Sequence, residues 1–349
     1  MPSLPESRGP VSDALLAALS RPVHDLGPVP LPAVADPVGD EDLQLALYCC
    51  YELHYRGLPG VDDAWEWEPS LLALRRELER QFEEGLVALA GPVTPEDVEP
   101  EGMDVALRAV EAADDSPSLS THLERDGTAG ELLEFVVHRS AYQLKEADPH
   151  AWALPRLSGP PKAALVEIEA DEFGGGRPDR IHAQLFADAM EGLGLDSRYG
   201  AYLDHIPAIT LATVNLMSFL GLHRARRGAI VGHLALFEMT SAVPNRRYAN
   251  ALRRLGFGDP RTTAFFDEHV EADAVHESVA AVDLAGGLVR QEPALCGDVL
   301  WGARALVAIE ARWSRELLGA WAEGRTSLRQ PLAERPRVGL IAPAAGRSR

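Results

Sequence analysis

The sequence predicts an all-α protein. Apolar residues recur with the period of an amphipathic helix in segment after segment. No run shows the strict apolar–polar alternation, bounded by turns, that marks a half-buried strand. We therefore expect a bundle of helices with one continuous core.

The expected helices follow one another along the chain. A Pro-rich leader, residues 1–40, contains one short helical pattern at Ser12–Leu19, and a single helical domain is expected over residues 41–325. Residues 326–349 are expected to form a basic, flexible tail. The helices expected within the domain are Glu41–Tyr55, Pro69–Ala90, Met103–Ala113, Ala129–Glu146, Lys162–Phe173, Arg180–Gly192, Tyr199–His205, Pro207–Leu220, Arg224–Ser241, Asn245–Leu255, Pro260–Ala281 and Cys296–Glu323.

Local residues support several of these boundaries. Asp40 is a good N-cap for the helix that follows it, and Pro69 fits the first turn of the next helix. Asp179 is placed to cap a further helix after a glycine-rich turn, and Gly192 is a natural stop for it.

Composition excludes some classes of function. The 349 residues are 46% hydrophobic and carry a formal net charge of −20. The chain can therefore bury a large core, and its charge argues against nucleic acid and anionic membranes as partners, with the locally basic tail from Arg325 onward as the exception. No apolar run reaches the length of a membrane span, and no signal peptide is recognised. Three cysteines without a CxxC pair suit a reducing, cytoplasmic location.

The segment 265–281 carries the strongest candidate for chemistry. His269, Asp273 and His276 stand at i, i+4 and i+7, so a turn of about 100° per residue places them on one stripe of a helix. Two imidazoles and one carboxylate suit iron, manganese or zinc. The alternative interpretation is a solvated acidic face, because three further glutamates lie on the same helix.

Other helices offer more ligand-type side chains. Glu131 and His138 share one face of a mostly apolar helix, with Glu134 between them as an alternative to Glu131. Glu238 follows two apolar residues on a helix with few other ionisable groups. Unpaired burial of such groups is costly, so metal coordination is one way to satisfy them. A solvent-facing stripe, or an ion pair with neighbouring arginines, is the alternative.

The remaining acidic and sulfur-containing residues carry weaker expectations. Glu167 and Glu172, on the helix after the Glu131 helix, are candidate additional ligands, with a solvated helix face as the alternative. His182 is interpreted as a core or surface histidine. Cys49 and Cys50 are interpreted as buried thiols.

The order of these groups resembles that of a known family. An E-x6-H pair, a lone Glu and an H-x3-D-x2-H helix follow one another as in the haem-oxygenase-like non-haem di-iron oxidases and oxygenases, in the branch described as iron-containing redox enzymes. The sequences DEFGGG at 171–176, GLHRARRGAIVGHLALFEMTS at 221–241 and EHVEADAVHE at 268–277 are also similar. The resemblance covers about residues 40–325. It implies a haem-oxygenase-like bundle of about seven core helices with extra N-terminal helices.

The resemblance also implies a function. It implies two non-haem iron ions and activation of dioxygen, with manganese in one of the two sites as an alternative. The metal ligands are then expected to be Glu131, His138, Glu238, His269, Asp273 and His276. We expect an iron-dependent oxidoreductase that uses O2 to oxidise a small substrate, with carboxylate-bearing and neutral compounds as the alternatives and a slight preference for the former. An electron donor and a second copy of the chain, forming a homodimer, are further candidate partners.

Two alternatives belong to other classes. One is a non-catalytic metal- or tetrapyrrole-binding bundle. The other is a cofactor-free, thiaminase-like relative, which would need a nucleophilic cysteine close to acidic residues.

Overall fold

The computed structural model describes residues 4–332, apart from the side chains of residues 271–275, and every regular element in this range is helical. The all-α prediction is therefore confirmed. The α-helices are α1 (Pro10–Leu19), α2 (Glu41–Glu52), α3 (Pro69–Ala90), α4 (Met103–Ala112), α5 (Leu119–Arg125), α6 (Ala129–Gln143), α7 (Asp148–Ala151), α8 (Gly159–Glu172), α9 (His182–Gly192), α10 (Ala208–Leu222), α11 (Arg227–Arg254), α12 (Pro260–Ser278), α13 (Gly287–Gln291) and α14 (Cys296–Ala322). A π-helix, η7 (Val279–Gly286), continues α12. Short 3-10 turns are η1 (Asp63–Trp67), η2 (Pro100–Gly102), η3 (Leu154–Arg156), η4 (Gly174–Gly176), η5 (Pro178–Arg180), η6 (Arg224–Arg226) and η8 (Pro293–Leu295).

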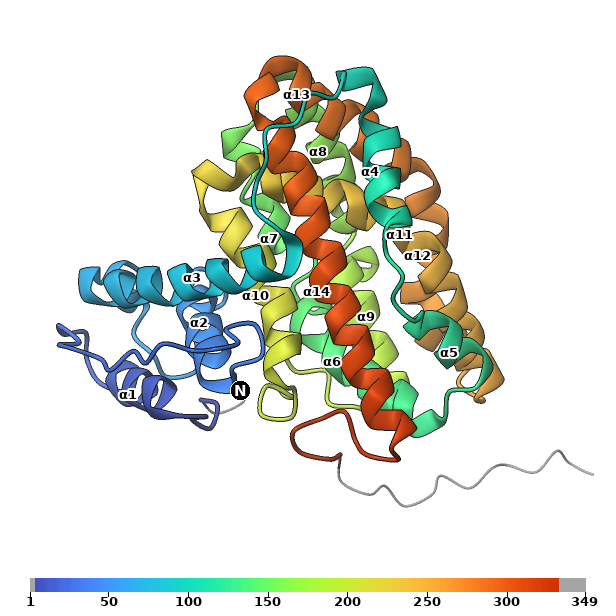
Figure 1. The fold of residues 1–349 in the computed structure, drawn as a ribbon. Coiled ribbons are helices and arrows are strands. Elements are labelled where there is room, and N and C mark those ends of the chain that lie inside the picture. Colours follow the sequence, from blue (N-terminus) through green and yellow to red (C-terminus); the bar gives the residue numbers. More distant parts are fainter. Residues whose placement is uncertain (1–3, 333–349) are drawn as a thin grey trace, which may run out of the picture.

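Helix α11 is the centre of the bundle. It packs against α12, α14 and α5, while α12 also packs against α9. Figure 1 shows α14 running the length of the bundle, and α14 also packs against α10, α3 and α4. Helix α10 is buried around its whole circumference, since every residue from Ala208 to Gly221 is buried, as expected for a central helix. Within residues 4–332, no helix is both long and apolar enough to cross a membrane.

Two glycines allow α11 and α14 to approach closely. A Cβ atom on Gly232 would lie 1.8 Å from the carbonyl oxygen of Val299, and one on Gly302 would lie 1.9 Å from that of Ala229. Any larger side chain would push the two helices apart, because real Cβ atoms do not approach oxygen so closely. This close crossing fixes the position of α11, which carries part of the candidate site.

The N-terminal helices form a separate group on one side of the bundle (Figure 1). Helix α1 packs on α2, and α2 packs on α10 and α3. At the other end of the chain, residues just beyond α14 fold back, and the Arg329 backbone N–H donates to the carbonyl of His205 at 2.8 Å. The proposed boundaries at residues 40 and 325 stay predictions, and most of the expected tail lies outside the described residues.

The helices differ from expectation in a few places. Helix α11 runs without a break through Pro244, where two helices were expected. Proline removes one hydrogen bond from the helix, and burial of α11 against three neighbours outweighs that loss. Helix α5 was not expected, and Ser118 begins it by accepting the Thr121 N–H. The predicted helix at Tyr199–His205 is a series of turns.

Candidate metal centre

Two overlapping groups of ligand-type side chains lie inside the bundle. In the first group, Glu146, Glu172, His182 and His269 each offer an atom within 4.8 Å of the others. In the second group, Glu172, Glu238 and His276 do the same. All these residues are buried. Glu172 belongs to both groups, so one carboxylate lies between two candidate cation positions.

Four helices and one turn bring these residues together. His269 and His276 come from α12, Glu238 from α11, Glu172 from the last residue of α8, and His182 from the first residue of α9. Because the ligands come from elements far apart in sequence, the folded bundle determines their geometry.

Glu146 lies in the turn between α6 and α7. Its neighbour Ala147 has a φ of 72°, and it is the one non-glycine residue of the described chain with positive φ. Such a conformation costs about 1–3 kcal/mol and persists where the surroundings impose it. The helix expected to reach Glu146 instead ends at Gln143. Pro149 lies in the first turn of α7, where its missing backbone N–H costs nothing, so it suits the start of a new helix directly after the turn.

The spacing of the ligand atoms suits a metal ion. His182 Nδ1 lies 2.8 Å from Glu172 Oε2, His276 Nδ1 lies 3.2 Å from Glu238 Oε2, and His269 Nε2 lies 3.4 Å from Glu146 Oε1. Two ligands at right angles, each about 2.1 Å from one ion, would be about 3 Å apart. The His182–Glu172 contact is short but is not aligned as a hydrogen bond. That combination is typical of neighbouring ligands.

Further contacts orient two of the imidazoles. His269 Nδ1 lies 2.7 Å from the carbonyl oxygen of Phe265, which can only accept, so the proton belongs on Nδ1 and the Nε2 lone pair faces Glu146. His276 Nε2 lies 3.0 Å from Asp171 Oδ2, which directs Nδ1 toward Glu238. Carbonyl and carboxylate partners of this kind commonly orient metal-binding histidines.

The buried carboxylates create a demand for positive charge. Burial raises the pKa of Glu146. Burial also raises the pKa of Glu169, one turn from Glu172, to about 9, with Glu172 and Glu238 adding to the effect. Burial lowers the pKa of His276, but the hydrogen bond and charge of Glu238 outweigh it and raise that pKa to about 9. A divalent cation held by these groups would supply the missing charge, so the residues present fit a metal ion.

The turn between α8 and α9 holds Glu172 and His182 next to each other. Three consecutive glycines, residues 174–176, have positive φ and reverse the chain. A Cβ atom on Gly174 would lie 2.6 Å from the backbone carbon of Arg180 and 2.7 Å from the backbone nitrogen of Ile181. Only glycine fits this position without opening the turn.

We expect Gly174→Ala to lower the iron content of the protein. Opening the turn separates Glu172 from His182 and adds backbone strain of about 1–3 kcal/mol. The matched control is Gly175→Ala, because Gly175 has a φ of 60° but nothing within 4 Å of an added Cβ atom. Metal analysis and thermal unfolding of both variants test this. Equal iron content in the two variants would contradict it.

The structure places four of the sequence-predicted candidates away from both groups. Glu131 accepts the Thr128 N–H at 2.6 Å as part of a capping box at the start of α6. About 18 Å of helix separates it from the Gln143 end of α6. His138 is buried between Thr210 Oγ1 and Ser327 Oγ, at 2.6 and 3.0 Å. Glu134 accepts from Ser327 and Trp321, and Glu167 is exposed.

The other candidates are brought together. His269, His276, Glu238 and the additional candidate Glu172 all belong to the two groups. The side chain of Asp273 lies outside the described residues, so its role as a ligand stays a prediction.

Glu146 and His182 are the two members that the sequence did not identify. The spacing of ten residues from Glu172 to His182, across a glycine turn, could have indicated His182. A helix, a sharp reversal and a second helix bring their adjoining ends together.

We expect Glu131→Ala to leave the iron content unchanged. The variant loses a capping box, which costs about 1 kcal/mol of stability. Glu134→Ala, a second candidate that lies away from both groups, serves as the comparison. Iron analysis with urea unfolding separates the two effects. A loss of iron from folded Glu131→Ala protein would return Glu131 to the ligand set.

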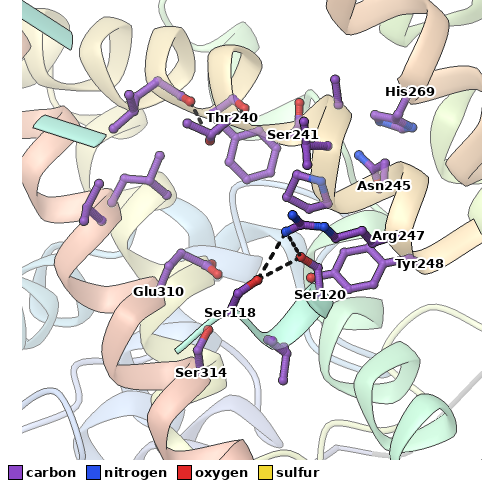
Figure 2. Close-up of a pocket in the computed structure, with 18 of the residues that line it drawn as sticks. Ser118, Ser120, Thr240, Ser241, Asn245, Arg247, Tyr248, His269, Glu310 and Ser314 are labelled. Carbon is purple, nitrogen blue, oxygen red and sulfur yellow. Dashed lines mark hydrogen bonds between the residues drawn. The ribbon is translucent and has the colours of Figure 1, made fainter. Parts of the chain in front are cut away.

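A cavity of about 550 Å³ reaches the first group, and Glu146 and His269 form part of its wall. Figure 2 shows His269 at one side of this cavity, with Asn245, Arg247 and Tyr248 nearby. The aromatic residues that line it are Phe135, Phe186, Phe237, Tyr248, Phe266 and Trp313. An apolar wall with a few polar groups is typical of a small-molecule site.

Comparison with known proteins identifies the family. The sequence model of the iron-containing redox enzymes matches residues 133–311, a range that contains all six residues of the two groups. Nitrosourea synthase from Streptomyces achromogenes subsp. streptozoticus is 31% identical over 146 residues, which is 42% of this chain. The matched segment spans 31% of that relative's length. The chain belongs to the family of iron-containing redox enzymes.

Proposed function

We propose that this chain is a non-haem oxidase or oxygenase that holds two iron ions and uses O2 to oxidise a small organic substrate. The observation that carries the proposal is the pair of buried ligand groups that share Glu172 beside a cavity of about 550 Å³. Three carboxylates and three imidazoles form a ligand set suited to iron, with manganese in one position as the alternative.

The iron ions would supply the redox chemistry with O2, and the protein would position and protect the reacting groups. Glu146, Glu172, His182 and His269 would hold one ion, and Glu172, Glu238 and His276 the other. Asp171 and the Phe265 carbonyl keep two imidazoles in the required orientation. Asp273 is retained as a proposed seventh ligand.

The cavity would bring the substrate to the side of the first group that faces the cavity. Glu146 and His269 line its wall, whereas Glu238 and His276 lie behind them and do not line it. The aromatic side chains in the lining would limit the access of water to the reacting centre, which would strengthen electrostatic interactions there. The family of iron-containing redox enzymes supports a redox reaction, and the similarity to a nitrosourea synthase supports a small-molecule substrate.

Loading the protein with ferrous iron under anaerobic conditions tests this proposal. Metal analysis should find two iron ions per chain. Admission of O2 should then produce a visible absorption that decays faster when a substrate is present. If iron instead oxidises slowly to a stable ferric form, and no compound in a screen of small carboxylates and neutral molecules changes the rate, metal storage becomes the better interpretation.

The cysteines give no support to a cofactor-free, thiaminase-like activity. Cys49, Cys50 and Cys296 are all buried. Burial raises the pKa of Cys50 to about 12, and the pKa of Cys49 is raised further. These side chains remain thiols at neutral pH, and the thiolate is the nucleophilic form.

A further inference from the structure

The cavity beside the metal centre contains three arginines that differ in their partners. Arg139 is held by both carboxylate oxygens of Glu310, at 2.9 and 2.7 Å. Arg108 is paired with Glu111 and Glu277. Arg247 is different, because its one carboxylate contact among the described residues is Glu124, 3.9 Å from Nε.

Arg247 instead faces two serine hydroxyls. Its Nη1 atom lies 3.4 Å from Ser118 Oγ and 3.3 Å from Ser120 Oγ. Figure 2 marks both contacts with dashed lines. The two hydroxyl oxygens are 3.2 Å apart, so one hydroxyl can donate to the other. The proton of the second hydroxyl then stays available. The cluster therefore offers a guanidinium and a hydroxyl donor to an anion. A carboxylate is the common partner of such a set.

Holding α5 against α11 does not require Arg247. Arg254 donates to the backbone carbonyls of Leu123, Glu124 and Gly127 in and after α5. Asn250 also donates to the side chain of Glu124 at 2.8 Å. These contacts fix the same two helices, so a purely structural role leaves the position of Arg247 in the cavity wall unexplained.

We infer that Arg247, with Ser118 and Ser120, is a carboxylate-binding subsite at the outer end of the cavity. This inference rests on the proposed function, because it places the other end of the substrate at Glu146 and His269. Ser118 is exposed and His269 is buried, so the cavity runs from the surface to the metal centre. The cavity wall also contains apolar side chains, among them Leu236, Phe237 and Phe266. The ligand class is a monocarboxylate with an apolar body.

The charge of the whole chain makes a specific cation necessary. A net charge of −20 repels anions. Four of the five acidic residues in the cavity wall, including Glu310 and Glu277, are paired with arginines or belong to the metal centre. The remaining one, Asp114, accepts the N–H and hydroxyl of Ser116. Arg247 is therefore the group that can compensate the charge of a bound carboxylate.

Calorimetric titration of the iron-loaded protein, kept anaerobic, tests the subsite with octanoate and its uncharged analogue octanamide as probes. We expect octanoate to bind more tightly than octanamide, and Arg247→Met to weaken octanoate binding by about 10-fold or more with little effect on octanamide. The matched control is Arg246→Met, because Arg246 is exposed and does not line the cavity. The melting temperature of Arg247→Met should stay close to that of the parent.

The outcomes separate this inference from the proposed function. Octanoate binding that is absent, no tighter than octanamide binding, or unchanged in Arg247→Met would overturn the subsite, even if the protein holds two iron ions. If the carboxylate coordinates iron directly, octanoate binding would be unchanged in Arg247→Met. A parent protein that binds no iron but still binds octanoate through Arg247 would contradict the proposed function and leave the subsite standing.

Discussion

Glu172→Gln is expected to remove iron from both positions. Glu172 is the one residue shared by the two ligand groups, and the amide keeps the volume of the side chain while losing its charge. Glutamine offers one uncharged carbonyl oxygen and cannot bridge two cations as a carboxylate does. We expect the affinity for iron to fall by more than about 100-fold at each position, because even residues that only orient a ligand contribute about 10- to 100-fold.

The stoichiometry of single-group variants makes this test specific. His182→Ala should lose the ion of the first group and keep the other, and Glu238→Gln should do the reverse. Glu167→Gln is the matched control, because Glu167 is an exposed glutamate on the same helix as Glu172. Iron per chain is measured by metal analysis, and circular dichroism checks the helical content. If Glu172→Gln retains both ions, or loses no more than Glu167→Gln, the two-position centre is wrong.

The members of the two groups that the sequence identified are those whose placement follows from local spacing. His269 and His276 lie two turns apart on one uninterrupted helix, so the helical period places them on one face. Glu238 was recognisable as a carboxylate on an apolar stretch that becomes the buried centre of α11. In both cases the helix itself determines which side faces the core.

The residues that the sequence missed depend on turns. Glu146 reaches the centre because α6 ends at Gln143, and His182 does so because three glycines reverse the chain after α8. Periodicity shows that a side chain faces inward but does not show which neighbour it meets. Glu131 and His138 share one face of α6, but a capping box satisfies the first and Thr210 and Ser327 satisfy the second.

Lys145 is a buried residue that the sequence does not reveal. A lysine next to an acidic residue near a helix end is usually on the surface. Its side chain is only 1% exposed, and Nζ lies 2.9 Å from the carboxylate of Glu52, whose side chain is 2% exposed. The Tyr199 hydroxyl donates to the other Glu52 oxygen at 2.6 Å, and Lys145 Nζ lies 4.3 Å from the centre of the Tyr55 ring. Lys145→Met leaves the Glu52 charge buried without its cation.

Lys145→Met is therefore expected to destabilise the protein by about 3–5 kcal/mol, as is typical when one member of a buried ion pair is removed. Adding Glu52→Leu should restore much of this loss, because an apolar pair of similar volume carries no uncompensated charge. Arg80→Met is the control, because Arg80 forms exposed pairs with Glu77 and Glu84 and should change stability little. Urea unfolding of the four variants, Glu52→Leu alone among them, measures the coupling between Lys145 and Glu52. If Lys145→Met loses no more stability than Arg80→Met, water reaches the pair. If the double variant is less stable than either single variant, the charges themselves stabilise this part of the core.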